Sequence, residues 1–396
     1  MKTIKTVGVF FGSKSAEHEI SIVTGQLIIN TLKKLGYKVI PVYITKQGKW
    51  IVDERLSNIT FFTQNTDFVE SPEKYIKSNF SIDVTATKKI VIRSFGKLFP
   101  TTYEIDIAFP ALHGTFGEDG TIQGIFEMLN VPYVGCNVTS SAIAMDKSLT
   151  KELISFHGIP TPDFITFHKD EWKLDKDSLI QNIQSKLKLP VFVKPPHTGS
   201  SIGITKVKSW DDLENAIEVG FFYDNKILVE QGIENTLDLT CCVIGVDKPI
   251  ASLIQQSEFK SDLFDFNEKY INDGGTQTGN ATKNLIIPAK IDSETTDKIR
   301  KTAINVYKIL GATGIARVDF VMDSNTKEFY VTEVNPLPGT LYHHLWKASG
   351  IEIEELVENL IEYAIQAHLE KNEIEYTFKS DVLNNLKGQK LKSVTE

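Results

Sequence analysis

The chain carries IARVDF at residues 315–320 and VTEVN at residues 331–335, and these two stretches decide its fold. Both are rich in β-branched residues, as strands are. The segment between them contains DSNTK at residues 323–327, which is rich in turn-forming residues. The pattern therefore predicts a β-hairpin near the C-terminal end of the chain.

The predicted hairpin gathers polar side chains on one face. Residues i and i+2 of a strand point to the same side, so Arg317 and Asp319 share a face, as do Glu333 and Asn335. Two carboxylates and an amide oxygen suit Mg²⁺, which leaves coordination positions for phosphate. The alternative is a solvated hairpin with cross-strand salt bridges. For an isolated hairpin, the solvated alternative is favoured. The rest of the chain reverses this preference in favour of a Mg²⁺ site.

The composition is that of a globular protein with more than one domain. The chain has 396 residues, of which 41% are apolar and 24% are charged, and this length indicates two or three domains. The formal net charge of −8 argues against a nucleic-acid partner. The three cysteines show no CxxC spacing, so they indicate neither a disulfide framework nor a zinc site.

The sequence predicts a cytoplasmic protein without membrane insertion. No apolar run approaches the ~20 residues that a membrane span needs. The apolar run at residues 7–11 is too short for a signal peptide. Free thiols also fit a reducing compartment.

Strands and helices alternate from the N-terminus. Residues 6–11 and 38–43 are predicted strands that flank a helical pattern ending at Gly36, which is typical of the βαβ opening of a parallel sheet. Residues 50–103 are polar and irregular, and we expect a peripheral insertion or hairpin there. Further strands are predicted at 106–112, 132–134, 190–194 and 227–230, and helices near 293–310 and 351–370.

The predicted fold class is α/β with several domains. We expect an N-terminal α/β domain over residues 1–136, including the insertion, and a second region over 137–230. A third region is expected over 231–378, followed by a polar tail over 379–396.

A second group of residues fits a nucleotide. Lys194 ends a predicted strand and leads into PPHTGSSIG at residues 195–203, a loop whose backbone N–H groups can wrap over phosphates. The loop lacks the Walker A pattern. Lys147 at a helix start can reach phosphate, and Glu230 at a strand end can accept a hydrogen bond from adenine. The alternatives are a plain turn, a solvated lysine and a strand-end charge in solvent.

A set of short motifs follows in order along the chain. They are AEHEIS (16–21), LHGTFGEDG (112–120), MDK (145–147), KP with GSSIG (194–203), EKY (268–270), GIARVDF (314–320) and EVNPLPG (333–339). Together these motifs resemble those of one known family, the D-alanine–D-alanine ligases of the ATP-grasp superfamily. The similarity covers roughly residues 4–370. It implies a three-domain ATP-grasp architecture with an N-terminal doubly wound parallel sheet.

The resemblance implies that the activity is ATP-dependent ligation of two D-alanines through an acyl phosphate, for peptidoglycan precursors. It implies a homodimer and small-molecule partners, namely ATP and D-amino acids. It also implies that Asp319, Glu333 and Asn335 hold two Mg²⁺ or Mn²⁺ ions. The implied nucleotide-binding residues are Lys147, Lys194, Ser201, Glu230 and Lys269, with Asp238 as a ribose ligand despite an extra residue before it.

Other matching positions take roles around the amino-acid substrates. The resemblance implies that Glu17 holds the ammonium of the first D-alanine, near His113. A triad of Glu17, Ser200 and Tyr270 would position a lid loop, for which residues 255–282 are the candidate; an ordinary surface loop is the alternative. Arg317 and the backbone N–H of Gly339 would stabilise the oxyanion of a tetrahedral intermediate.

The segment after Gly339 departs from the family pattern. It continues as TLYHHLW at residues 340–346 and is shorter than usual. Thr340 can supply the hydroxyl that holds the second substrate's carboxylate, while His343 and His344 can line that subsite or be structural. A relative that joins D-alanine to D-lactate, D-serine or another acceptor therefore stays open. A nucleotide-binding regulator on a degenerate scaffold is disfavoured, because the polar hairpin residues are all present.

Overall fold

The N-terminal part of the chain is built on a mixed sheet in which three strands are parallel. The computed structural model describes residues 5–86, 88–96, 100–258 and 285–381. β1 (Thr6–Gly12) pairs in parallel with β2 (Lys38–Ile44) and β7 (Ile107–Pro110), and β3 (Trp50–Val52) adds an antiparallel edge. The predicted βαβ opening is confirmed. The strand expected at 132–134 is reduced to one bridge between Ala108 and Tyr133.

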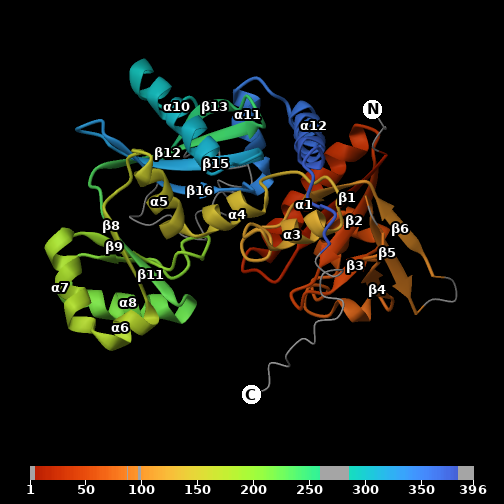
Figure 1. The fold of residues 1–396 in the computed structure, drawn as a ribbon, viewed down its shortest axis with the longest axis horizontal. Coiled ribbons are helices and arrows are strands. Elements are labelled where there is room, and N and C mark those ends of the chain that lie inside the picture. Colours follow the sequence, from red (N-terminus) through yellow and green to blue (C-terminus); the bar gives the residue numbers. More distant parts are fainter. Residues whose placement is uncertain (1–4, 87, 97–99, 259–284, 382–396) are drawn as a thin grey trace.

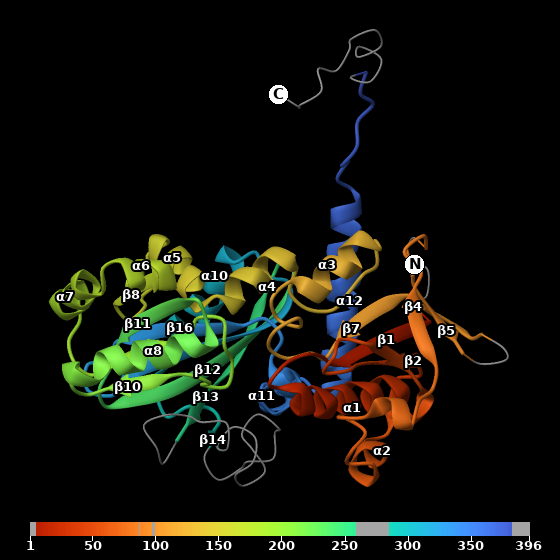
Figure 2. The same cartoon turned by 90° about the horizontal axis from the view of Figure 1, so that it is seen from below.

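Helices cover both faces of this sheet, as in a doubly wound fold (Figures 1 and 2). Alternate residues of β1 point to opposite sides. Val9 therefore packs in the cluster that contains residues of α1 (His18–Lys34), while Phe10 packs in the cluster that contains residues of α3 (Thr121–Met128). The apolar strand predicted at residues 6–11 is thus buried on both faces.

Residues 50–103 are more regular and more buried than the sequence suggested. Phe62 and Phe68 are only 8% and 0% exposed and join the N-terminal core beside Tyr43. The expectation that the segment is irregular and peripheral is corrected here. The reason is that these aromatic residues follow no regular period, so their burial is not visible in the sequence. Besides β3, the segment forms η1 (Glu54–Ser57), α2 (Ile59–Gln64), η2 (Pro72–Lys74), and an antiparallel sheet of β4 (Asn79–Ile82), β5 (Ile90–Phe95) and β6 (Thr102–Ile105). The expected hairpin is confirmed by the antiparallel pairing of β4, β5 and β6.

The central part is an antiparallel sheet with helices packed on it. Its strand order is β10–β9–β11–β8. Val193, Ile217 and Val229 lie in its own apolar core. Its elements are β8 (Phe164–His168), α6 (Lys169–Leu174), α7 (Lys176–Lys186), β9 (Val191–Lys194), β10 (Thr205–Val207), η3 (Trp210–Asp212), α8 (Leu213–Tyr223) and β11 (Lys226–Gln231).

The C-terminal part is a second antiparallel sheet, in the order β14–β13–β12–β15–β16. The helices expected near 293–310 and 351–370 are confirmed as α10 and α12. The elements are α4 (Val138–Met145), α5 (Lys147–Phe156), β12 (Thr236–Gly245), β13 (Ile250–Ser257), β14 (Leu285–Ile286), α10 (Ser293–Ile309), β15 (Gly314–Asp323), β16 (Phe329–Asn335), η6 (Gly339–Tyr342), α11 (His343–Ala348) and α12 (Ile353–Asn372). No helix in the described ranges is long and apolar enough to cross a membrane.

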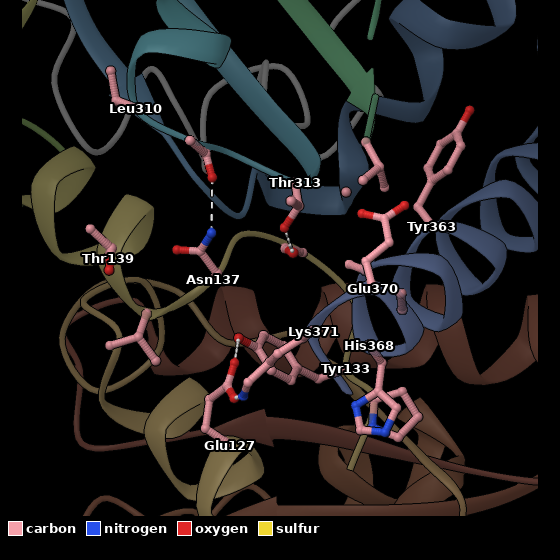
Figure 3. Close-up of a pocket in the computed structure, with 18 of the residues that line it drawn as sticks. Glu127, Tyr133, Asn137, Thr139, Leu310, Thr313, Tyr363, His368, Glu370 and Lys371 are labelled. Carbon is pink, nitrogen blue, oxygen red and sulfur yellow. Dashed lines mark hydrogen bonds and ion pairs between the residues drawn. The ribbon is translucent and has the colours of Figure 1, made fainter. Parts of the chain in front are cut away.

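The C-terminal helix α12 returns to the N-terminal part and packs there. Leu356 and Leu360 belong to the same apolar cluster as α1. Further along α12, Lys371 forms an ion pair with Glu127 of α3, and Glu127 accepts a hydrogen bond of 2.8 Å from Tyr133 (Figure 3). A cavity of about 530 Å³ lies at this junction. Apolar and ionic contacts therefore hold α12 against the N-terminal part of the chain.

Candidate active site

The predicted hairpin forms. β15 and β16 pair antiparallel, with Arg317 opposite Asn335 and Asp319 opposite Glu333. A register shift follows Asp319, but the four polar side chains are brought together as predicted. The opposite face carries Val318 and Val334, which are buried in the C-terminal core.

Asp319 is the centre of the polar face. Arg317 donates to it from Nε at 2.9 Å and from Nη2 at 2.6 Å. Asn335 Nδ2 donates to Asp319 at 3.1 Å, and Thr240 Oγ1 of β12 donates at 2.9 Å. Glu333 lies 3.7 Å from the same guanidinium. Arg317 also lies over the ring of Tyr342, 4.9 Å from its centroid, so the charges are both paired and fixed in place.

The donor set on this face fits a divalent cation. Burial raises the pKa of Asp319, Arg317 opposes this rise, and the nearby charge of Glu333 adds to it. A bound cation would offset the repulsion between the two carboxylates. The described residues include no group of three or more His, Cys, Asp or Glu arranged for a metal. The set here is instead two carboxylates and one amide, which is the kind of partial shell that Mg²⁺ accepts beside phosphate.

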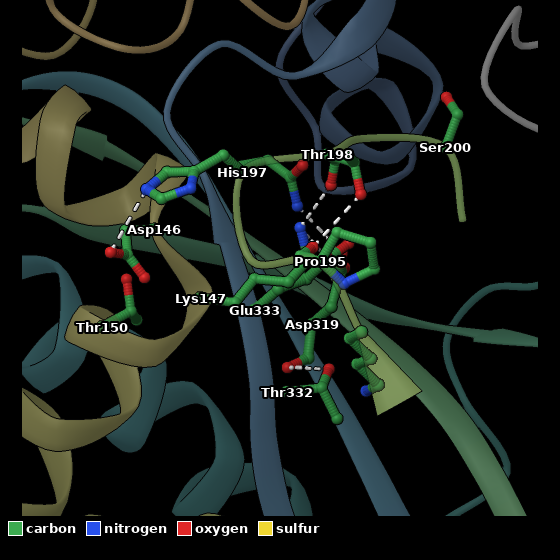
Figure 4. Close-up of polar contacts among 12 residues, drawn as sticks. Asp146, Lys147, Thr150, Pro195, His197, Thr198, Ser200, Asp319, Thr332 and Glu333 are labelled. Carbon is green, nitrogen blue, oxygen red and sulfur yellow. Dashed lines mark hydrogen bonds and ion pairs between the residues drawn. The ribbon is translucent and has the colours of Figure 1, made fainter. Parts of the chain in front are cut away.

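Lys147 connects this hairpin to the loop at residues 195–203. It is the first residue of α5, and its side chain is only 13% exposed. Its Nζ lies 3.4 Å from Glu333 and donates to the carbonyl of Thr198 at 2.8 Å. Figure 4 shows Lys147, Thr198 and Glu333 grouped beside Asp319. The alternative of a solvated helix lysine is therefore wrong for Lys147.

The loop carries a strained backbone where it reaches the N-terminal part. Ser200 and Ser201 have φ values of 52° and 60°, in the left-handed region. Ser200 Oγ donates to Glu17, the N-cap residue that precedes α1. At Gly199 a Cβ would lie 3.0 Å from Glu17 Oε2, so a larger residue would press on this carboxylate. Two members of the predicted triad are thus in contact.

A buried lysine pair holds Glu230. Lys194 at the end of β9 donates to Glu230 Oε1 at 2.6 Å, and Lys151 Nζ lies 2.6 Å from Oε2. The side chains of Lys151 and Glu230 are 1% and 4% exposed. Lys151 was not singled out from the sequence. The sequence signal for Lys151 was its distance of four residues from Lys147, because residues four apart on a helix lie on the same face.

A small polar cavity lies where the hairpin, the loop and the N-terminal part meet. Its volume is about 40 Å³, and it is lined by several predicted site residues. His113 is buried there and bonds Thr24 Oγ1 through Nε2 at 2.8 Å. Burial lowers the pKa of His113. The predicted residues on the wall are Glu17, His113, Lys147, Ser200, Arg317, Glu333, Asn335 and Gly339.

Glu118 lines the same cavity and was given no role from the sequence. It is fully enclosed, and its Oε2 accepts a hydrogen bond of 2.9 Å from the backbone N–H of Gly114. Burial, followed by the charge of Glu17, raises the pKa of Glu118 to about 8. The motif LHGTFGEDG contained this residue, but only the tertiary structure shows that its carboxyl group faces Glu17.

Some predicted residues lie away from this cavity. Asp238 lines a wider cleft of about 810 Å³ between the two antiparallel sheets, together with Phe192 and Lys206. Lys194, Glu230, Ser201 and Thr340 are not among the residues on the wall of the small cavity. Lys269, Tyr270 and most of the candidate lid at 255–282 lie outside the described residues.

The segment after Gly339 forms a tight buried turn. Thr340, Leu341 and Tyr342 have φ values of 48°, 56° and 50°, which is strained for side chains of this size. The backbone N–H of Thr340 donates to Thr24 at 3.2 Å. His344 bonds Gln255 at 2.7 Å, and burial lowers its pKa to about 4.

The two antiparallel sheets, with a serine-rich loop, lysines and hairpin carboxylates at their junction, define an ATP-grasp enzyme. The chain belongs to the D-alanine–D-alanine ligase family. The family models "D-ala D-ala ligase N-terminus" and "D-ala D-ala ligase C-terminus" match residues 6–136 and 153–362. The D-alanine–D-alanine ligase of Caldicellulosiruptor bescii is 39% identical over 375 residues, covering 94% of this chain and 98% of the relative.

Solved structures agree with this assignment. The D-alanine–D-alanine ligase of Coxiella burnetii has a TM-score of 0.76 at 30% identity, covering 93% of this chain and 97% of that one. The VanG D-Ala:D-Ser ligase of Enterococcus faecalis has a TM-score of 0.74 at 30% identity, covering 91% and 100%. The predicted α/β ATP-grasp fold is therefore confirmed.

Proposed function

We propose that this protein joins two D-alanines with ATP to give D-alanyl-D-alanine for peptidoglycan precursors. One observation carries the proposal. Glu17, bonded to Ser200, and Arg317 line one small cavity that adjoins the polar face of the hairpin. The cavity thus pairs a carboxylate that can hold an ammonium with a guanidinium that can hold a carboxylate. An amino acid carries both groups.

The chemistry proceeds in two balanced steps. The carboxylate oxygen of the first D-alanine attacks the γ-phosphorus of ATP, the bond to the bridging oxygen breaks, and ADP leaves. The amine of the second D-alanine then attacks the acyl carbon, loses a proton, and expels inorganic phosphate. Arg317 and the N–H of Gly339 would stabilise the oxyanion formed on the way. Exclusion of water from the site would limit hydrolysis of the acyl phosphate.

The nucleotide is assigned to the space between the two antiparallel sheets. Lys147 and the loop at 195–203 would hold the phosphates, Lys194 and Glu230 would lie toward the base, and Asp238 would approach the ribose. Asp319, Glu333 and Asn335 would hold Mg²⁺ or Mn²⁺, which supplies charge neutralisation during phosphoryl transfer when bound. Lys269, Tyr270, Ser201 and Thr340 keep their predicted roles as part of this proposal, as do the homodimer and the cytoplasmic location.

The acceptor is the finer part of the proposal. The Coxiella and Enterococcus structures are similar to this chain to nearly the same degree, although one is named a D-alanine–D-alanine ligase and the other a D-Ala:D-Ser ligase. The curated relatives at 36–39% identity that span nearly the whole chain carry the name D-alanine–D-alanine ligase, which favours D-alanine. Joining D-alanine to D-serine or D-lactate is the second candidate, supported by the shortened turn at 340–342.

The test is an acceptor panel with the purified protein, ATP and Mg²⁺. Phosphate release is measured together with product mass, using D-alanine alone and then D-alanine with D-serine or D-lactate in competition. We expect D-alanyl-D-alanine as the main product at neutral pH, and no product from L-alanine. Preferential formation of the D-lactate or D-serine product overturns the acceptor assignment. No phosphate release with any D-amino acid overturns the ligase proposal.

A further inference from the structure

His197 of the loop at 195–203 lies between two aspartates that belong to different elements. Its Nδ1 is 2.7 Å from Asp224 Oδ2, and its Nε2 is 3.3 Å from Asp146 Oδ2. Asp224 follows α8, while Asp146 is the N-cap of α5 and accepts from the N–H groups of Ser148 and Leu149. Figure 4 shows the ring of His197 directed at Asp146. One imidazole thus joins the loop to two elements.

This geometry fits the charged form of the ring. A neutral imidazole has one N–H and can donate to only one carboxylate, whereas the imidazolium donates from both nitrogens. The two aspartate side chains are 7% and 6% exposed, so their negative charges are largely removed from water and need positive partners. Lys226 Nζ supplies the fourth charge, 3.1 Å from Asp146. Two carboxylates and two cations therefore balance. The hydrogen bonds that His197 makes to Asp146 and then to Asp224 raise the pKa of His197 to about 9.

The residues on either side of His197 are bonded to Lys147. The backbone N–H of Lys147 donates to the carbonyl of Pro196 at 3.3 Å, and its Nζ donates to the carbonyl of Thr198 at 2.8 Å. Lys147 directly follows Asp146 in the chain. The contacts of His197 and those of Lys147 thus both join the loop at 195–203 to the start of α5. A shift of the loop would therefore also shift Lys147.

We propose that His197 is a positioning residue, which as an imidazolium fixes the loop at 195–203 against the start of α5 and so sets where Lys147 and Ser200 meet the substrates. This inference rests on the proposed function, because it takes Lys147 as a phosphate-binding residue.

The competing explanation is a salt bridge that only stabilises the fold. The side chain of His197 is 46% exposed, and ion pairs with an exposed partner contribute little to stability. A merely stabilising pair would lower the melting temperature when removed and leave nucleotide affinity unchanged. A positioning residue would change nucleotide affinity, because displacing Lys147 alters the phosphate contacts that depend on its reach.

The experiment measures Mg²⁺-ADP binding and the KM for ATP in three variants. His197→Gln keeps a polar side chain but cannot be charged, His197→Arg keeps the charge and its N–H donors, and His157→Gln changes an exposed histidine at the other end of α5. We expect His197→Gln to weaken ADP binding and raise the KM for ATP by roughly 10-fold, with a smaller change in kcat. His197→Arg should restore most of this loss, and His157→Gln should match the unmodified protein.

The pH dependence gives an independent readout. The charged groups facing His197 are Asp146, Asp224 and, through Asp146, Lys226. Because the pKa is raised to about 9, the contribution of His197 is fully present below its ordinary value of 6.5 and is lost as the pH rises through about 9. ADP affinity of the unmodified protein should fall across that step. His197→Gln should lack the step, and His197→Arg should keep its affinity above it.

Two outcomes separate this inference from the proposed function. Unchanged ADP affinity and an unchanged pH profile in His197→Gln, even with a lower melting temperature, overturn the positioning role alone. Failure of the unmodified protein to use any D-amino acid overturns the ligase proposal, while ADP binding by the His197 variants still decides the role of His197.

Discussion

The cavity between α3 and α12 and the small cavity beside the hairpin both contain polar side chains, but these side chains have different partners. In the cavity of about 530 Å³ between α3 and α12, Asn137 donates to the carbonyl of Gly311 at 2.8 Å and Thr313 donates to Gly135 at 3.1 Å (Figure 3). Its polar groups bind each other across a junction of chain segments. The cavity of about 40 Å³ is instead lined by three buried ionisable side chains, those of Glu17, Glu118 and Arg317.

The difference shows that volume is a poor guide to function in this chain. The large cavity holds side chains whose hydrogen bonds fasten the linker before α4 to the start of β15. The small one concentrates ionisable groups at a place where burial makes every charge costly. Buried ionisable groups of this kind cluster at binding and catalytic sites. The small cavity is therefore the better candidate for the active site.

Replacing Arg317 tests the small cavity most severely. We expect Arg317→Ala to lower kcat by ~100-fold or more, because it removes the charge assigned to the oxyanion. The loss also leaves Asp319 buried beside Glu333, so Arg317→Lys and melting temperatures are measured in parallel. Arg55, which forms a comparable pair with Asp53 on the surface, is the matched control. Arg55→Ala should change stability by no more than about 1 kcal/mol and leave kcat unchanged. A near-normal rate in Arg317→Ala would remove it from the oxyanion role.

Glu333→Gln tests the metal assignment on the hairpin. The substitution keeps the shape and removes one of the two carboxylates, so the Mg²⁺ concentration needed for half-maximal rate should rise roughly 10-fold, with a lower maximal rate. The measurement is a Mg²⁺ titration of the ligase reaction. Glu328→Gln, on the exposed part of the same hairpin, should behave like the unmodified protein. An unchanged metal response in Glu333→Gln contradicts the assignment.

Glu118 should make the folded protein sensitive to pH. Its pKa is raised to about 8 from an ordinary value of 4.5, chiefly by burial and next by the charge of Glu17. The stabilising contribution is therefore complete below about 4.5 and declines as the pH rises through about 8. Melting temperatures of Glu118→Gln should depend less on pH across this range than those of the unmodified protein. Parallel curves for the two proteins would show that Glu118 is ionised in the folded state.

Thr313→Val in the large cavity should have the smallest effect. It removes a hydrogen bond to Gly135 without changing the side chain's shape, so we expect a loss of about 1 kcal/mol of stability. The KM for ATP and kcat should stay unchanged. Urea unfolding measures the loss of stability, and steady-state rates measure the KM for ATP and kcat. A marked change in rate would mean that the large cavity takes part in the reaction and would break the comparison.

The hairpin was predictable because its information is local. A strand has a period of two, so the sequence alone places Arg317 with Asp319 and Glu333 with Asn335, and turn formers specify that the strands fold back. The βαβ opening and helices α10 and α12 follow from local periodicity in the same way. Within residues 50–103 the hairpin was predicted, but the burial of Phe62 and Phe68 was not, because the aromatic residues of this segment have no regular spacing.

What only the tertiary structure decided is which distant groups face each other. Glu118 lies beside Glu17, Lys151 pairs with Glu230, and His197 bridges Asp146 and Asp224. Each contact joins segments that are separate in the sequence, and no local period encodes it. The sequence by itself determined the hairpin, the grouping of its polar side chains and the family. The folded chain decided the burial and charge around it, because both depend on the packing of segments that the sequence keeps apart.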